Sequence, residues 1–342
     1  MRHTTLALVP LLAALGCRHE ARDDRDMPIA AADDDDDDDE IELPGDSGDD
    51  GGAESGESGD FEDKLDIPTA PEMSCQKIDF LFVIDDSGSM SDEQERLIDG
   101  FPGFIEKVEG AIAQYDYHMM VVTTAFDLED AEEVVACDDA IGSGRTADGE
   151  GEDCGLSSED APQRYASSDE ESLGDIEASG LADVFSCVAD VGVTGSGFEL
   201  PIWSMAQAIT THDLPGGCNE GFLRDDAILV VTIISDEEEN KGMDSPGGPK
   251  LWKEVMVAAK HGDENAIVML GLLGDTDLED GQCEPYDPMQ GTGAEGAPRL
   301  RKFVDSFEYG SWASVCQDDY APFFNAAVAD IGQACHEFVP PG

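Results

Sequence analysis

The chain has 342 residues, which is long enough for one sizeable α/β domain plus a tail. Its 79 acidic residues against 18 basic ones give a formal net charge of −61. A field of that sign repels nucleic acid and anionic lipid. The composition therefore excludes nucleic acid as a partner and leaves cationic partners open.

The first 17 residues have the pattern of an export signal. Arg2 precedes an apolar stretch from Leu6 to Leu15, which is too short to span a bilayer and is typical of a signal peptide. The small residues before Cys17 resemble the lipobox of bacterial lipoproteins, in which the cysteine becomes the acylated first residue. This resemblance implies an exported protein, lipid-anchored at Cys17 in the cell envelope, at the outer membrane or the cell surface. An ordinary signal peptide with a chance cysteine is the alternative.

Residues 18–74 form an acidic stretch that contains a run of seven aspartates, Asp33 to Asp39. So few apolar residues cannot bury enough surface to offset the conformational entropy of the chain. We therefore expect a disordered spacer that is extended by its own charge.

The chain has nine cysteines, an odd number for an exported protein. If Cys17 carries lipid, eight remain for four disulfides in an oxidising compartment. The absence of any Cys-x-x-Cys pair argues against a zinc knuckle or a thioredoxin-like centre. The sequence does not choose a pairing. Our working guess joins near neighbours and the domain ends: 137 with 154, 187 with 218, 283 with 316, and 75 with 335.

From Lys77 onward, apolar runs alternate with amphipathic stretches, which is typical of βαβ folds. The nearly continuous apolar runs 78–84 and 227–234 predict central parallel strands that are covered on both faces. Residues 117–124 and 266–273 predict two further strands. The fold class that we expect is α/β, with a doubly wound, mostly parallel sheet and helices on both faces.

The helices of this fold are predicted from their apolar stripes. Ser91 and Gln94 have the spacing of a capping box for the first helix. Gly100 and Pro102 are expected to kink or restart that helix. The remaining helical stripes cover 104–112, 181–189, 200–209, 251–260, 298–307 and 323–334.

Residues 127–180 are acidic and lack strong periodicity, with Arg145 and Arg164 as their only basic residues. A stretch of this length without regular structure is normally functional or mobile. We predict a surface insertion here.

Asp85, Ser87 and Ser89 form an Asp-x-Ser-x-Ser motif where the strand over 78–84 ends and a helix begins. Ligands of open parallel sheets collect at the carboxyl ends of the strands. Three oxygen-bearing side chains within five residues suit a hard divalent cation such as Mg²⁺. Taken alone, however, the same residue types are also common as helix caps and turn formers.

Two further segments complete a pattern. Thr194 lies in the glycine-rich segment 192–197 before a predicted helix, and Asp236 follows the strand over 227–234. With the first motif, these segments resemble the von Willebrand factor A (VWA) family over residues 78–338. Its metal-ion-dependent adhesion site is built from Asp-x-Ser-x-Ser, a Thr of a second loop and an Asp after the fourth strand. The resemblance implies a Rossmann-like VWA domain over 75–342, with these ligands: Asp85, Ser87, Ser89, Thr194 and Asp236. Ser196 is an alternative to Thr194.

The resemblance also implies a function. In the VWA family, the bound cation accepts a carboxylate from a partner, so we expect a surface-anchored binding protein that captures an acidic group of a protein or surface polymer. Mg²⁺ is the expected ion, with Ca²⁺ or Mn²⁺ as alternatives. The acids Glu237, Glu238 and Glu239 add negative charge, for which we weigh two effects: a preference for Ca²⁺ over Mg²⁺, or weaker binding of anionic ligands. A purely structural cation without ligand exchange is the alternative. No enzyme is expected, because no Gly-x-Ser-x-Gly elbow, His-Glu-x-x-His pair or P-loop occurs.

Overall fold

The computed structural model describes residues 75–112, 115–124, 136–156, 163–168, 180–195, 197–239, 247–287, 289 and 292–341. The predicted export signal with Cys17 and the predicted spacer over 18–74 lie outside these residues. Within the described ranges, no helix combines the length and the apolar character that crossing a membrane requires.

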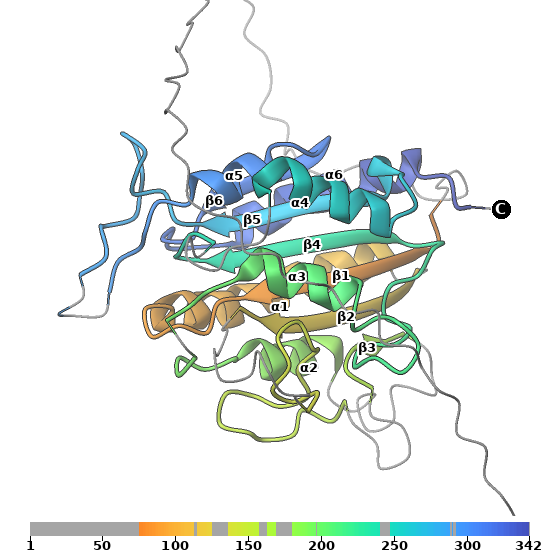
Figure 1. The fold of residues 1–342 in the computed structure, drawn as a ribbon, viewed down its shortest axis with the longest axis horizontal. Helices are drawn as coiled ribbons and strands as arrows, with labels where there is room; N and C mark the ends of the chain where they lie inside the picture. Colours follow the sequence, from red (N-terminus) through yellow and green to blue (C-terminus); the bar gives the residue numbers. More distant parts are fainter. Residues whose placement is uncertain are drawn as a thin grey trace, which may run out of the picture. The chain divides into compact units, whose positions relative to one another are not determined.

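A six-stranded sheet with the order β3-β2-β1-β4-β5-β6 forms the centre of the fold (Figure 1). Its strands are β1 (Lys77–Ile84), β2 (Asp116–Thr123), β3 (Ala166–Ser167), β4 (Ile228–Ser235), β5 (Ile267–Leu273) and β6 (Tyr309–Ser314). All neighbours are parallel except β2 and β3. The chain builds one half of the sheet outward from β1 and the other half outward from β4. The predicted doubly wound, mostly parallel sheet is confirmed.

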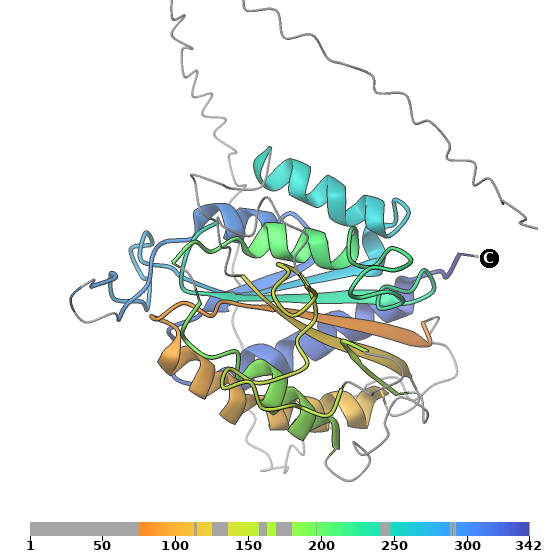
Figure 2. The same cartoon turned by 60° about the horizontal axis from the view of Figure 1, so that its bottom comes forward.

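Among the described residues, six α-helices cover the two faces of this sheet: α1 (Ser91–Ile112), α2 (Gly180–Ala189), α3 (Pro201–Ile209), α4 (Gly248–Ala259), α5 (Pro298–Val304) and α6 (Ala321–Glu337). A short 3₁₀ turn, η3 (Glu264–Ala266), precedes β5. Helices α1, α2 and α6 pack on one face, and α3, α4 and α5 pack on the other, as the two layers in Figure 2 show.

The central strand β1 shows why its sequence is apolar throughout. Phe80 and Phe82 belong to the core under α1, α2 and α6, whereas Leu81 and Val83 belong to the core under α3, α4 and α5. Successive side chains of a strand point to opposite faces, so a strand that is covered on both faces needs apolar residues at every position.

Helix α1 continues through Gly100 and Pro102, so the predicted restart was wrong. Leu97 and Phe104, on either side of these residues, are both buried, and the Phe104 ring lies 4.8 Å from that of Phe324 in α6. Packing of both halves of α1 on the core outweighs the single backbone hydrogen bond that proline removes.

Two strands were missed by the sequence patterns. Strand β6 has the sequence YGSWAS, and four of its six residues are only partly buried at the edge of the sheet. Strand β3 has two residues and lies within the predicted insertion. Neither segment has the apolar run by which a central strand is recognised.

Four disulfides join Cys75 to Cys335, Cys137 to Cys218, Cys154 to Cys187, and Cys283 to Cys316. The first and last pairs confirm our guess, whereas the guesses 137–154 and 187–218 were wrong. The near-neighbour rule failed because the two cysteines of the insertion bond to different elements and not to each other: Cys154 bonds to α2 and Cys137 to the loop after α3. Four disulfides are typical of an exported protein.

Part of the predicted insertion packs against helix α3 and the loop that follows it. The buried Asn219 side chain accepts from Gly144 N at 2.9 Å and donates to Gly142 O at 2.8 Å. Gly142 has a φ of +80°, and a Cβ there would lie 2.5 Å from Ser204 O in α3. The chain therefore approaches α3 so closely that only glycine fits.

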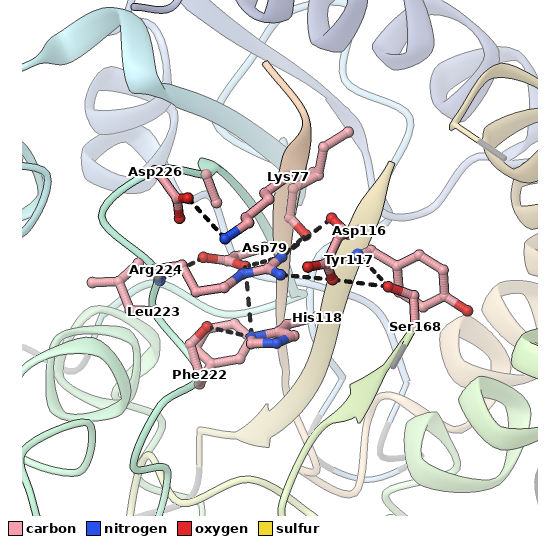
Figure 3. A network of polar contacts seen from close by, with 12 residues as sticks. Lys77, Asp79, Asp116, Tyr117, His118, Ser168, Phe222, Leu223, Arg224 and Asp226 are labelled. Carbon is pink, nitrogen blue, oxygen red and sulfur yellow. Dashed lines mark hydrogen bonds and ion pairs between the residues drawn. The ribbon is translucent and has the colours of Figure 1, made fainter. Parts of the chain in front are cut away.

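A buried acid at the amino edge of the sheet is neutralised by an arginine (Figure 3). Asp79 in β1 is fully buried and accepts from Arg224 N and Arg224 Nε, each at 2.8 Å. Arg224 also pairs with Asp116 at 2.7 Å, and His118 Nδ1 lies 3.7 Å from Asp79 Oδ1. Burial outweighs the Arg224 charge and raises the pKa of Asp79 from 3.8 to about 6.

We predict that Arg224→Met destabilises the fold by about 3–5 kcal/mol at pH 8, because the buried Asp79 loses its guanidinium counter-charge and, among the described residues, keeps only the backbone N–H of residue 224 as a close donor. Loss of the guanidinium raises the folded-state pKa of Asp79 further above its unfolded value. The folded variant can then hold a proton on Asp79 at pH 5, so the destabilisation is smaller there and grows as the pH rises. Urea denaturation at both pH values, with the disulfides intact, measures the difference.

Lys77→Met is the matched control, since it removes a cation from the same strand end. The Lys77 and Asp226 side chains are 34% and 47% exposed, so their ion pair contributes less than about 1 kcal/mol. An Arg224→Met loss that is equal at pH 5 and pH 8 would contradict this account of Asp79.

Candidate metal centre

The candidate metal centre lies at the carboxyl edge of the sheet, where β1 and β4 end side by side. Asp85 follows β1, and its backbone N–H donates to Ile234 O of β4 at 3.0 Å. Asp236 follows β4 directly. Both side chains are buried, with 0% and 1% exposure. The two aspartates therefore meet at the point where the chain order of the sheet reverses, which is where open α/β sheets bind ligands.

The first loop is held in shape by its own polar groups. Asp85 Oδ1 accepts from Ser87 N at 2.8 Å, and Asp85 Oδ2 accepts from Ser235 Oγ at 2.6 Å. The hydroxyl oxygens of Ser87 and Ser89 lie 3.1 Å apart. The Ser89 hydroxyl is near enough to Asp236 to lower the pKa of its carboxyl group. The structure thus brings together four of the five predicted ligands.

The second loop is tied to the first, but its threonine is not enclosed. Gly195 N donates to Asp86 O at 2.9 Å. The Gln94 side chain, which we expected to cap α1, instead donates to Asp85 O at 3.1 Å and to Gly192 O at 2.6 Å. Thr194 is exposed, in contrast to the buried aspartates. The alternative residue, Ser196, lies outside the described residues.

Glu199 is an acid at this edge that the sequence patterns missed. Its side chain is 0% exposed, and its Oε2 accepts a hydrogen bond from the Thr124 hydroxyl. It stands in the segment Phe198-Glu199-Leu200 directly before Pro201 of α3. The available signal was a lone acid between large apolar residues, directly before the predicted helical stripe 200–209, and the sequence analysis gave it no role.

Two of the three acids after Asp236 stabilise helix ends. Glu239 Oε2 accepts from Ile202 N at 2.8 Å, and Glu238 Oε2 accepts from Arg299 N at 2.7 Å. Ile202 and Arg299 stand in the first turns of α3 and α5, where backbone N–H groups lack helical partners. Burial, followed by the charge of Asp85, raises the pKa of Glu237, whereas burial alone raises that of Glu238.

The electrostatics of the centre are those of acids crowded together out of water. Burial, followed by the charge of Asp85, raises the pKa of Asp236 to about 8, that of Glu199 to about 10 and that of Glu237 to about 7. Burial also raises the pKa of Asp85. Within the described ranges, no lysine or arginine forms an ion pair with any of these four carboxyl groups.

Two buried oxygens without hydrogen-bond partners show that this set of donors is suited to a cation. Asp236 Oδ1 and Glu199 Oε1 are buried and have no hydrogen-bond partner. A buried polar atom without a partner costs free energy that a bound ion would recover. The donors are all oxygens, which suits Mg²⁺ or Ca²⁺. In the part of the chain that the structure describes, no three or more His, Cys, Asp or Glu side chains are grouped for metal binding, so the serine hydroxyls are needed to complete the set.

Comparison with known proteins adds little to this geometry. No protein-family model and no curated protein matches the sequence. The structure is similar to that of proximal thread matrix protein 1 (PTMP1) from the mussel byssus, with 13% identity and a TM-score of 0.31. The match covers 69% of this chain and 49% of that one, so the chain spans about half the length of PTMP1. So distant a likeness says nothing about ligands or partners.

We predict that Asp236→Asn abolishes stabilisation by Mg²⁺ without weakening the metal-free fold. An ion at 100 times its dissociation constant adds about 2.7 kcal/mol to the stability of a protein that binds it only when folded. In EDTA at pH 8 the variant should melt no lower than the wild type, because it lacks a buried charge. Thermal unfolding with Mg²⁺ and with EDTA measures both effects.

Asp305→Asn is the control, since Asp305 is an exposed acid at the end of α5. This variant should keep the full response to Mg²⁺. An Asp236→Asn protein with the same Mg²⁺-dependent shift as the wild type would exclude Asp236 from the site.

Proposed function

We propose that the protein is a metal-dependent binding protein whose carboxyl edge holds one divalent cation. The proposed ligands are Asp85, Ser87, Ser89 and Asp236, together with one residue of the second loop, for which the motif gives Thr194. The observation that carries the proposal is Asp236 Oδ1, a buried carboxylate oxygen without a partner beside the equally buried Asp85. A cation is the group that such a pair lacks.

The chemistry of the donors supports capture of an acidic group. Ser87 and Ser89 are neutral, so a divalent ion that they help to hold keeps positive charge for an incoming carboxylate. The ion would supply Lewis acidity toward that carboxylate. Mg²⁺ is the first candidate and Mn²⁺ an alternative, while the nearby Glu237 adds charge that favours Ca²⁺.

The strong negative charge of the whole chain is a second reason why binding of an acidic partner would require the ion. A protein with a net charge of −61 repels other acidic molecules. A bound cation would offer an acidic protein or surface polymer a local point of attraction, at short range where salt screens the rest of the field. Export and a lipid anchor at Cys17, with the 18–74 spacer between the anchor and the domain, would hold the domain at the cell envelope. The four disulfides support export.

The depth of the two aspartates favours one alternative, a cation that only stabilises the fold. Asp85 and Asp236 have almost no exposed surface, as expected of a closed structural site. In that case an ion would bind, but it would not accept a carboxylate from a partner. The two functions therefore differ in whether the bound ion accepts a further ligand.

Isothermal titration of Mg²⁺, Mn²⁺ and Ca²⁺ into the full chain tests the ion site. We expect one ion per chain in the wild type, above a weak background from the acidic residues, and loss of that ion in Ser87→Ala/Ser89→Ala. The double variant leaves the charge unchanged, so the background is the same for both proteins. Ser306→Ala, which removes a hydroxyl that donates to Phe303 O in α5, is the control. Equal binding by all three proteins would refute the site.

Retention on beads that carry a glutamate-rich peptide then separates the two functions. Ligand capture predicts retention in Mg²⁺, release by EDTA, and no retention on beads with the matched glutamine peptide. A protein that binds one ion but is not retained on the glutamate beads has the structural cation instead.

A further inference from the structure

Glu199 is a buried acid to which the VWA-type motif assigns no role. Its side chain has 0% exposure, yet only one of its two carboxylate oxygens is satisfied. Oε2 accepts from the Thr124 hydroxyl, and Oε1 has no hydrogen-bond partner. An acid that serves only the fold would be expected to have both oxygens satisfied.

The strand register places Glu199 at the candidate metal centre. Ile84 of β1 pairs with Thr123 of β2, so the next residues, Asp85 and Thr124, end neighbouring strands at the same edge. Thr124 holds Glu199 through its hydroxyl and also accepts from Leu200 N at 2.9 Å. The carboxyl group of Glu199 is thereby fixed beside the strand end that bears Asp85.

The second loop is tied to the ends of two neighbouring strands. Gly195 N donates to Asp86 O after β1, and Leu200 N donates to Thr124 O after β2. Thr194 precedes both contacts and is exposed, whereas Glu199 directly precedes Leu200 and is buried. The position enclosed at the edge is therefore held by an acid.

We propose that Glu199, and not Thr194, is the residue that the second loop contributes to the cation site. The inference rests on the proposed function and deepens it. Thr124 orients the Glu199 carboxylate, and the charge of Glu199 joins those of Asp85 and Asp236 in attracting the ion. When a divalent ion is bound and all three carboxyl groups are ionised, the site keeps a net negative charge.

This charge balance has two opposite consequences. Glu199 strengthens binding of the cation, and it weakens the attraction of the bound cation for an incoming carboxylate. Removal of the Glu199 charge should therefore lower ion affinity and, at saturating ion, raise retention on a carboxylate surface. A residue that merely supported the fold would lower both.

The test compares Glu199→Gln and Thr194→Ala with the wild type, each as the full chain titrated with Mn²⁺ by calorimetry. We expect Glu199→Gln to lower Mn²⁺ affinity by about tenfold to a hundredfold, and Thr194→Ala to leave it within about twofold. Glutamine can still accept from the Thr124 hydroxyl, so the variant should melt in EDTA no lower than the wild type. Retention of Mn²⁺-saturated Glu199→Gln on the glutamate beads should exceed that of the wild type.

The outcomes separate this inference from the function on which it rests. A Mn²⁺ affinity that is unchanged in Glu199→Gln, or that is lost in Thr194→Ala, overturns the role of Glu199. Either result leaves the cation site itself standing. Failure of the wild type itself to bind one Mn²⁺ overturns the proposed function, and the role of Glu199 with it.

Discussion

Several carboxyl groups of the candidate metal centre are buried at the carboxyl ends of the parallel strands, and in the described part of the chain none of them forms an ion pair with a lysine or an arginine. The arrangement of the surrounding loops depends on this constraint. Asp85 and Asp236 stand at adjacent strand ends, out of contact with water. Neighbouring groups hold them in place: Ser235 binds the Asp85 carboxylate, and Gln94 ties the Asp85 backbone to the second loop. The loops are thus ordered around a concentration of negative charge that burial makes costly.

Buried acids occur at both ends of the parallel strands, but their surroundings differ. At the amino edge, Asp79 is neutralised within the chain by Arg224, which binds it through both the backbone and the guanidinium (Figure 3). At the carboxyl edge, the described residues supply hydroxyls and further acids in place of a base. An acid that a fold needs for stability resembles Asp79. Acids left without a counter-charge at a ligand-binding edge point to an external cation.

The fold was predictable to the extent that burial imposes a sequence pattern. Strands β1 and β4 are covered on both faces, so their apolar runs were evident, and the motif residues Asp85, Ser87, Ser89 and Asp236 follow from where those strands end. Strand β6 is an edge strand that is only partly buried, so it needs no continuous apolar run. Glu199 could not be recognised, because its importance arises from Thr124, a residue 75 positions away that the parallel register brings to it. Two of the disulfide guesses failed because Cys137 and Cys154 of the insertion bond to two different elements, which the sequence does not identify.

The account's central claim is that a cation completes the carboxyl edge, and anomalous scattering from crystals grown with Mn²⁺ tests it most directly. The account predicts one strong anomalous peak between the ends of β1 and β4, in contact with the side chains of the Asp85 loop and of Asp236. A well-ordered carboxyl edge without such a peak, or manganese bound only at acidic residues elsewhere on the surface, would contradict it.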